Sequence, residues 1–332
     1  MKQVLAFVCV LALIGAVALH GHRALDLPIQ EAEIHHVVEV PEGASFKDTA
    51  DLLARKGLIR SPAWFRLLGK FRDAERAIKQ GEYDLHTAMR PVEILNLMVS
   101  GRVIHYRVMI QEGLTAAQIS TVLGKTGIVQ ESEVARLVSD PAFIKALGID
   151  APMLEGYLYP DTYSFPKGSK ATDVVKTMVA RFRQVYTPEL QAQAAAIRMT
   201  ETQVLTLASI IEKEAARDVE RPVISAVFHN RLTRGMLLQS DPTVIYGIPN
   251  FSGNLTRKDL ARPTPFNTYR NRELPPGPIA NPGASSIQAA LNPAPVNYLF
   301  FVSKNDGTHH FSVTLGEHNR AVEQYQKKGA RE

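Results

Sequence analysis

The chain has 332 residues, of which 45% are hydrophobic and 21% are charged, an ordinary globular composition with room for roughly two or three domains. The net charge of +5 comes without any run of Lys and Arg, which favours membranes or cell-wall polymers as anionic partners and argues against nucleic-acid binding. The single cysteine, Cys9, excludes an intramolecular disulfide and a cysteine metal site.

The N-terminal segment from Val4 to Leu19 is apolar or small throughout and follows the basic start Met1-Lys2-Gln3. Its shortness and the Ala16-Val17-Ala18 pattern fit a cleaved signal peptide. The alternative is an uncleaved, single membrane-spanning anchor formed by residues 1–23. Both interpretations place the rest of the chain outside the cytoplasm.

Residues 24–35 form a polar connector to a small mixed domain predicted at residues 36–105. Its predicted elements alternate strand, helix, strand and helix, at residues 38–40, 45–56, 81–85 and 91–99. The first strand-turn-helix unit resembles a lysin motif, the grammar of cell-wall-binding modules, and its pattern recurs 70 residues later, from Val108 to Val129. The aromatic residues Trp64, Phe65 and Tyr83 either stack on sugars or form a core cluster.

Residues 106–332 are predicted to form a larger α+β domain, so the whole chain is assigned to the α+β class. Residues 130–200 have a helical pattern that is interrupted at 154–166, where tyrosines and carboxylates lie between prolines and glycines. This interruption is interpreted as a groove wall that offers rings and acceptors to sugars, or else as an aromatic turn packed on the core.

The helix around residues 204–216 carries two glutamates on an otherwise apolar segment. At about 100° per residue the apolar positions form one stripe, with Glu212 and Glu214 on its two sides. The residues one and two turns before Glu214 are bulky and apolar, whereas those before Glu212 include Ser209 and Ala208. Burial would therefore raise the pKa of Glu214, as a general acid requires, unless both are simply boundary glutamates of an amphipathic helix.

The remaining elements follow in order. A second helix is predicted at residues 220–232, and residues 237–247 are predicted to be a polar turn between apolar strands. Eight of the 20 prolines fall between Pro263 and Pro295, which indicates a long and stiff functional loop. A hairpin with its turn at residues 305–307 and a final helix close the chain.

A set of ordered motifs runs through this second half. They are A-S-I-I-E-K-E, F-H-N-R-L, Q-S-D-P-T-V-I-Y-G, N-T-Y, L-P-P-G-P-I and H-H-F, at residues 208–214, 228–232, 239–247, 267–269, 274–279 and 309–311. Together with the N-terminal segment, the lysin-motif-like region and Glu155-Gly156-Tyr157, they resemble the endolytic murein transglycosylase family, also called MltG or YceG-like. Two small departures from that family are Phe228-His229-Asn230, where an aliphatic residue often precedes Asn-Arg-Leu, and Ser240, where threonine is common.

The resemblance implies a lytic transglycosylase, a lyase that cuts glycan strands of peptidoglycan between N-acetylmuramic acid and N-acetylglucosamine and leaves 1,6-anhydromuramic ends. It places the catalytic residue at Glu214, and it implies neither a cofactor nor a metal. It further implies a protein of the cell inner membrane that acts in wall assembly and glycan length control beside peptidoglycan synthases, the penicillin-binding proteins. The residues expected to hold the strand are Gln239, Asp241, Thr243, Tyr246, Asn267 and Tyr269.

Two alternatives stay open from the sequence. A hydrolytic muramidase would pair Glu214 with a second carboxylate, Asp161 or Asp241. A membrane-tethered scaffold that binds peptidoglycan would not use Glu214 at all. A zinc hydrolase is disfavoured, because the His pairs at 35/36 and 309/310 are adjacent residues of strands and no H-E-x-x-H motif is present.

Overall fold

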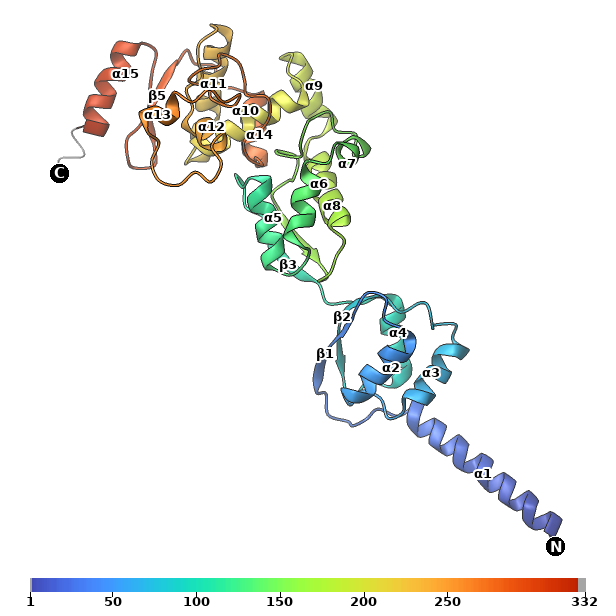
Figure 1. Cartoon of the computed structure of the whole chain (residues 1–332). Coiled ribbons are helices and arrows are strands. Elements are labelled where there is room, and N and C mark those ends of the chain that lie inside the picture. The colour runs from blue at the N-terminus through green and yellow to red at the C-terminus, as the bar shows by residue number, and fades with distance from the viewer. Residues whose placement is uncertain (1, 328–332) are drawn as a thin grey trace. The chain divides into compact units, whose positions relative to one another are not determined.

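The computed structural model describes residues 2–327 and divides the chain into two compact units. The first unit runs to Tyr106 and includes Ser164–Gly168, and the second contains Arg107–Tyr163 and the chain from Ser169 onward. Short paired strands and many helices occur together (Figure 1), which confirms the predicted α+β class.

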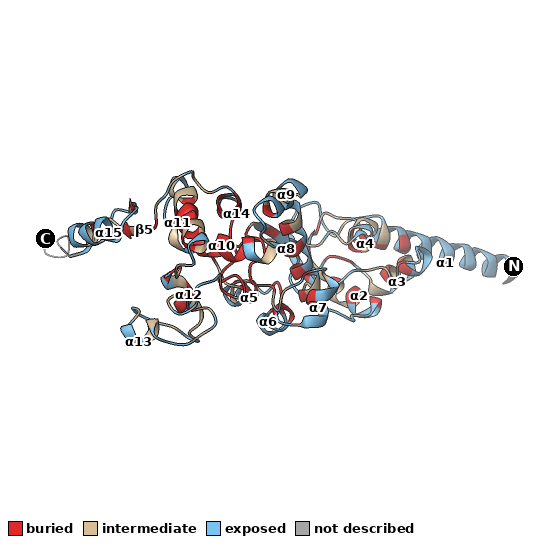
Figure 2. Cartoon of the chain, turned by 90° about the horizontal axis from the view of Figure 1, so that it is seen from above, coloured by how far each residue is buried: buried red, intermediate tan, exposed pale blue. Residues whose placement is uncertain are grey.

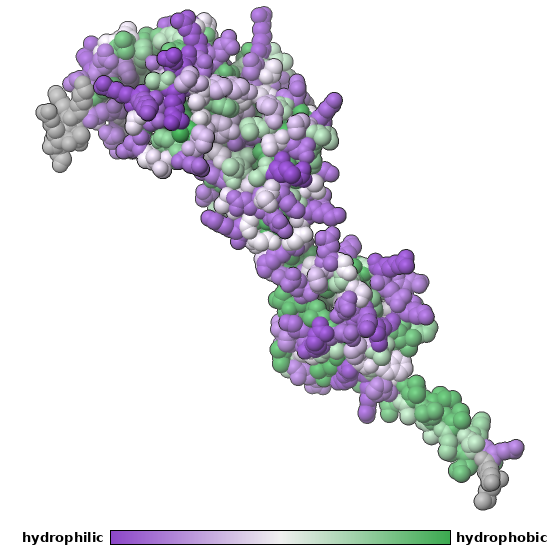
Figure 3. Space-filling model, in the orientation of Figure 1, coloured by the Kyte–Doolittle hydropathy of each residue, from purple (hydrophilic) through white to green (hydrophobic). Residues whose placement is uncertain are grey.

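Helix α1, Lys2–Leu25, carries the apolar N-terminal segment. Its side chains are almost all exposed (Figure 2), and they form a continuous hydrophobic surface (Figure 3). Within residues 2–327 it is the one helix long and apolar enough to cross a membrane, from Gln3 to Leu25. Length and composition fit the anchor and the signal peptide equally well.

The first unit is built on the antiparallel pair of β1, His35–Val40, and β2, Gly81–His86. Three helices pack with this pair around one core, α2 (Phe46–Arg55), α3 (Pro62–Phe71) and α4 (Pro91–Ser100). Phe65 and Tyr83 are fully buried in that core, whereas Trp64 lies against α1. Two of the three aromatic residues considered for sugar stacking therefore serve the core.

The repeated pattern has the same local geometry in both places. The second copy is β3, Tyr106–Met109, followed by α5, Ala116–Lys125. Ser45 and Thr115 each close a capping box at the start of their helix, and Gly57 and Gly127 adopt φ values of 69° and 71° after its end. These positive φ angles favour glycine, which explains the shared spacing.

The second unit has one long central helix, α10, Glu201–Glu214. The elements before it are α6 (Glu131–Val138), α7 (Pro141–Ala146), β4 (Thr162–Phe165), α8 (Ala171–Val185) and α9 (Pro188–Ala196). The elements after it are a 3₁₀ turn (Asp218–Glu220), α11 (Arg221–Thr233), α12 (Asp241–Tyr246), α13 (Arg257–Leu260), α14 (Ala284–Leu291), β5 (Phe300–Ser303), β6 (His309–Ser312), α15 (Leu315–Val322) and a π-helical turn (Glu323–Lys327).

Two expectations about these elements differ from the structure. Every residue from Val204 to Ile211 is buried, so α10 is covered on all sides and not on one stripe (Figure 2). The cause is that α9, α11, α12 and α14 all pack against it, which the pattern of a single helix does not reveal. The predicted polar turn between strands at 237–247 is also wrong, because Asp241–Tyr246 is the short helix α12, with Pro242 in its first turn.

The predicted C-terminal hairpin is confirmed. β5 and β6 pair antiparallel with Phe300 opposite Ser312 and Ser303 opposite His309. Asn305 and Gly307 in the turn have φ values of 64° and 80°, as a tight reversal requires. The hairpin places His309 and Phe301 together, with their rings 5.3 Å apart.

Candidate active site

Glu214 is the last residue of α10, and the next residue, Ala215, leaves the helix in an extended conformation. One oxygen of its carboxyl group, Oε1, accepts a hydrogen bond of 2.5 Å from the Ser240 hydroxyl. Burial raises the pKa of Glu214, and the nearby charge of Asp241 raises it further, while Ser240, His309 and Arg231 oppose the shift. Ser240 is a neutral partner, and none of the residues that the structure describes forms an ion pair with Glu214.

Glu212 has a different set of partners. Its Oε1 pairs with Arg221 Nη1 at 3.2 Å, and its Oε2 accepts a hydrogen bond of 3.0 Å from the backbone NH of Gly283. Its side chain is only 7% exposed. The sequence places Glu214 in the more apolar surroundings of the two, whereas in the structure Glu212 is shielded as well. What separates them is that Glu212 forms an ion pair with Arg221, while the hydrogen-bond partner of Glu214 is the neutral hydroxyl of Ser240.

Glu214 opens onto a pocket of about 400 Å³ in the second unit. Four of the seven predicted site residues line it: Glu214, Gln239, Asp241 and Tyr269. Its other lining residues are Arg231, Leu238, Phe301, Val302, Ser303, His309, His318, Val322 and Gln326.

Arg231 fixes the segment that carries Gln239 and Ser240. Its guanidinium donates to the carbonyl oxygens of Leu238 at 2.7 Å and Leu299 at 2.6 Å, so it ties this segment to the hairpin. Gln239 has a φ of 52°, an uncommon value for a residue with a side chain, and its NH donates to the Thr268 carbonyl at 3.1 Å. Such strain persists where surrounding contacts over-determine it, as they do at this pocket.

Asp241 and Tyr269 line the pocket as a hydrogen-bonded pair. The Tyr269 hydroxyl donates to Asp241 Oδ1 at 2.6 Å. Burial and the adjacent Asp241 carboxylate raise the pKa of the Tyr269 hydroxyl, so it stays protonated and keeps donating. This pair offers a fixed acceptor and an aromatic ring to a ligand.

The other three predicted residues lie outside the pocket and hold the surrounding loops. Thr243 is buried and bonds to the Ser240 carbonyl at 2.6 Å and to the Thr268 hydroxyl at 2.8 Å. Asn267 is also buried, and its amide donates to two backbone carbonyls of its own loop. Tyr246 donates to Glu155 Oε2 at 3.1 Å.

The three tyrosines of the segment at residues 154–166 are buried, which fits the aromatic turn packed on the core. Glu155 is 3% exposed and accepts bonds from the Ala116 NH and the Asn281 amide at 2.9 Å each. Burial raises the pKa of Glu155 to about 7. Asp161 pairs with Arg181 at 2.6 Å, and this bond lowers the pKa of its carboxyl group.

Sequence reasoning missed Arg231 and His309 as parts of the site, although both stand in the quoted motifs. His309 Nδ1 bonds to Glu220 Oε2 at 2.7 Å, and its NH donates to Glu220 Oε1 at 2.9 Å. The available signal was that each is a residue of a quoted motif that carries a side chain able to be charged. Among the residues that the structure describes, there is no group of three or more His, Cys, Asp or Glu side chains placed to hold a metal ion.

Known proteins resemble this chain over most of its length. A model of the YceG-like family matches residues 38–324. The protein named endolytic murein transglycosylase of Bacillus subtilis (strain 168) is 32% identical, over 94% of this chain and 91% of that protein. A protein of the same name from Streptococcus pneumoniae serotype 2 is 28% identical, over 97% of this chain but 65% of that protein.

A solved structure agrees with these relatives. The crystal structure of a YceG-like protein from Listeria monocytogenes superimposes with a TM-score of 0.60 at 36% sequence identity. The match covers 86% of this chain and 98% of that one. Family model, relatives and solved structure converge on one assignment: the chain belongs to the YceG-like family.

Proposed function

We propose that the chain is an endolytic lytic transglycosylase that cleaves the bond between N-acetylmuramic acid and N-acetylglucosamine within peptidoglycan strands. The observation that carries the proposal is the Glu214 carboxyl group, which opens onto a pocket, has a raised pKa and has a hydroxyl group as its hydrogen-bond partner. The relatives of the same family named endolytic murein transglycosylase support the choice of substrate.

The reaction needs one carboxyl group acting twice. Protonated Glu214 donates its proton to the glycosidic oxygen as the bond to the anomeric carbon breaks. The resulting carboxylate then takes the proton from the 6-hydroxyl of the same muramic acid. The oxygen of that hydroxyl bonds to the anomeric carbon and closes the 1,6-anhydro ring. The leaving strand keeps the first proton and Glu214 regains the second, so no water is consumed.

The pocket residues supply the surroundings for these steps. Ser240 orients the Glu214 carboxyl through its 2.5 Å hydrogen bond and stabilises the charge that forms after proton transfer. Asp241, Tyr269 and Gln239 are proposed to bind the sugar hydroxyls and to balance positive charge at the anomeric centre. His309, held by Glu220, supplies a further polar edge.

Thr243, Asn267 and Tyr246 are proposed to act on the strand indirectly. Their polar groups bond to the protein itself, so they position the loops that carry Ser240 and Tyr269. This revises the direct strand-holding role expected from the sequence.

The first unit is proposed to be the lysin-motif-like, wall-binding part of the protein, at residues 36–105, ahead of a catalytic part at 106–332. Its order of β1, α2, α3 and β2 supports this assignment. We further propose that α1 stays in the inner membrane as an anchor with the body outside the cytoplasm, and that peptidoglycan synthases are the protein partners. The exposed apolar surface of α1 supports the anchor.

One observation favours a second candidate. Asp241 shares the pocket with Glu214, so a hydrolytic muramidase with two carboxylates has a physical basis. Asp161 offers none, because it is paired with Arg181 and does not line the pocket.

The products decide between these reactions. The detergent-solubilised full chain is incubated with nascent uncrosslinked glycan, beside Glu214→Gln and the exposed control Glu189→Gln, and the released fragments are analysed by mass spectrometry. Internal fragments with anhydromuramic ends, made by the wild type and the control only, are the expected result. Reducing ends would establish hydrolysis, and intact glycan with all three proteins would favour the scaffold.

A further inference from the structure

Helix α3 in the first unit carries two apolar faces. Phe65 and Gly69 face the core of the unit. Trp64, Leu67, Leu68 and Phe71 follow the spacing i, i+3, i+4, i+7 and so form a second stripe, in which Leu68 also packs against the core. Phe71 is 79% exposed and Leu67 is 40% exposed, so the unit itself leaves much of this stripe uncovered.

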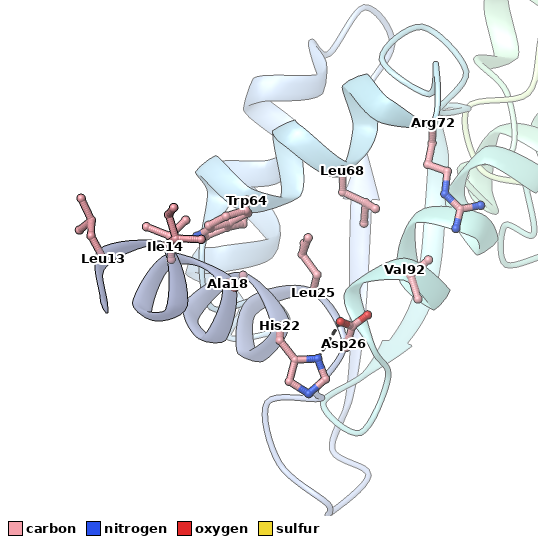
Figure 4. A pocket seen from close by; sticks show the side chains of 12 residues that line it. Leu13, Ile14, Ala18, His22, Leu25, Asp26, Trp64, Leu68, Arg72 and Val92 are labelled. Atoms are coloured by element: carbon pink, nitrogen blue, oxygen red, sulfur yellow. Dashed lines mark hydrogen bonds and ion pairs between the residues drawn. The ribbon is translucent and has the colours of Figure 1, made fainter. Parts of the chain in front are cut away.

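The stripe borders a groove of about 660 Å³ between α1 and α3 (Figure 4). Trp64 and Leu68 point into it from α3, and Arg72 and the His22–Asp26 pair lie toward its other end. The α1 residues that line its apolar part are Leu13, Ile14, Val17 and Ala18.

Specific contacts join the C-terminal end of α1 and the residues after it to the first unit. The Trp64 ring lies so close to Gly21 that an added Cβ would be 3.0 Å from its Cη2 atom. Arg60 donates to the carbonyl oxygens of Leu27, Pro28 and Ile29 at 2.6–3.0 Å. The residues that follow α1 are therefore bound to the first unit and do not form a free linker.

The position of the groove residues along α1 indicates what can fill the groove. Leu13 lies about 18 Å along the helix axis from Leu25, at 1.5 Å per residue. The hydrocarbon core of a bilayer is about 30 Å thick, so a spanning α1 places Leu13, Ile14 and Val17 among acyl chains. These residues are all exposed on α1 as well as lining the groove.

We propose that the α3 stripe and this groove form a membrane-contact face, occupied by phospholipids of the leaflet nearest the first unit. The inference rests on the membrane anchoring proposed above, but not on the catalytic role of Glu214. Trp64 packs on Gly21 near the C-terminal end of α1, where a spanning helix would meet the boundary between lipid and water that tryptophan prefers. Lys70 is exposed on α3 and Arg72 lines the groove, and both are long cations of the kind that reach lipid phosphates. Helix α3 contains no acidic residue that would repel them.

Trp64 is the single tryptophan of the chain, so its fluorescence tests the proposal directly. The full chain is reconstituted into vesicles of phosphatidylethanolamine and phosphatidylglycerol, with and without lipids brominated on their acyl chains. Bromine is expected to reduce Trp64 emission roughly two-fold and aqueous acrylamide to quench it weakly, as for an interfacial residue.

A second probe separates contact by α3 from mere closeness to α1. Trp64→Phe combined with Phe71→Trp moves the reporter to the most exposed position of the stripe, and quenching by bromine is expected there too. Trp64→Phe combined with Leu315→Trp places the reporter on an exposed site of α15 and should respond to acrylamide alone. A Phe71→Trp reporter that acrylamide quenches freely and bromine does not would overturn the proposal.

Intact mass distinguishes this failure from a failure of the anchor. Chain isolated from membranes is expected to retain residues 1–23. A mature chain that starts after Ala18 would show that α1 is a signal peptide and would overturn both the anchor and the contact face, whereas a retained α1 with an unquenched Phe71→Trp reporter would overturn the contact face alone.

Discussion

The two glutamates at the end of α10 are two residues apart and lie in opposite chemical surroundings. Glu212 is held by Arg221 and by the backbone NH of Gly283, in a cluster where Arg221 also bonds to Asp218 and Ser286. Glu214 has the Ser240 hydroxyl and an open pocket. The difference teaches that burial alone does not decide the role of a carboxylate: a buried ion pair, as at Glu212, stabilises the fold, whereas a buried carboxyl group with a neutral partner, as at Glu214, is left for proton transfer.

The largest expected effect is on activity at Glu214. Glu214→Gln keeps the size of the side chain and removes the proton donor, so the rate of formation of anhydro ends should fall roughly 10²- to 10⁴-fold. The pKa of Glu214 is raised in the folded chain. The contribution of this carboxyl group to stability is therefore fully present at pH values below 4.5, the usual pKa of a glutamate, and is lost as pH rises through the folded pKa. Glutamine has no such loss, so thermal unfolding at neutral pH should show the variant equal to or more stable than the wild type. A clear fall in Tm would contradict this picture.

The same substitution at Glu212 should have the opposite outcome, a loss of stability with little loss of activity. Glu212→Gln breaks the buried pair with Arg221 and should cost about 2–3 kcal/mol of unfolding free energy, since Asp218 remains as a partner for the cation. Unfolding in denaturant measures this cost, and activity at low temperature should stay within a few-fold of the wild type. If Glu212→Gln kept its stability but lost activity, Glu212 and not Glu214 would carry the chemistry.

A subtler change sharpens the comparison through pH. Ser240 donates to the Glu214 carboxylate and so favours its charged form, which means that Ser240→Ala should raise the pKa of Glu214 further. The reaction starts from protonated Glu214, so activity is lost as pH rises through this pKa, and the alkaline limb of the rate profile should move to higher pH. Ser286→Ala, beside Arg221 in the Glu212 cluster, is the control and should leave the limb in place.

The sequence predicts Glu214 correctly as a shielded carboxyl group, but for an incomplete reason. Spacing along one helix indicates which residues share a face, and it says nothing of the segments that later cover the others. The all-round burial of α10, the partner Arg221 of Glu212 and the hydroxyl of Ser240 all depend on contacts between distant segments.

The same limit explains the uneven outcome for the predicted strand-holding residues. Polar and aromatic types suit sugar binding, yet the same types also satisfy the backbone of long loops. Gln239, Asp241 and Tyr269 reach the pocket, while Thr243 and Asn267 bond inside the loops. Elements with strong local signals were predictable, such as the hairpin with Asn305-Asp306-Gly307, but α12 was not, because a six-residue helix has too little periodicity.

The smallest expected effects come from removing the hydroxyl oxygen of two tyrosines. They test the distinction between residues that line the pocket and residues that hold the loops. Tyr246→Phe loses the bond to Glu155 and should lower stability by about 1 kcal/mol with little change in rate, because Tyr246 lies outside the pocket. Tyr269→Phe loses the bond to Asp241 at the pocket itself, so its main effect should appear in the rate or in KM for glycan strands. Steady-state kinetics and thermal unfolding of both variants separate the two roles. A Tyr246→Phe variant that is as stable as the wild type but slow would return Tyr246 to the strand-binding residues, since a loop-holding role acts on activity only through the fold.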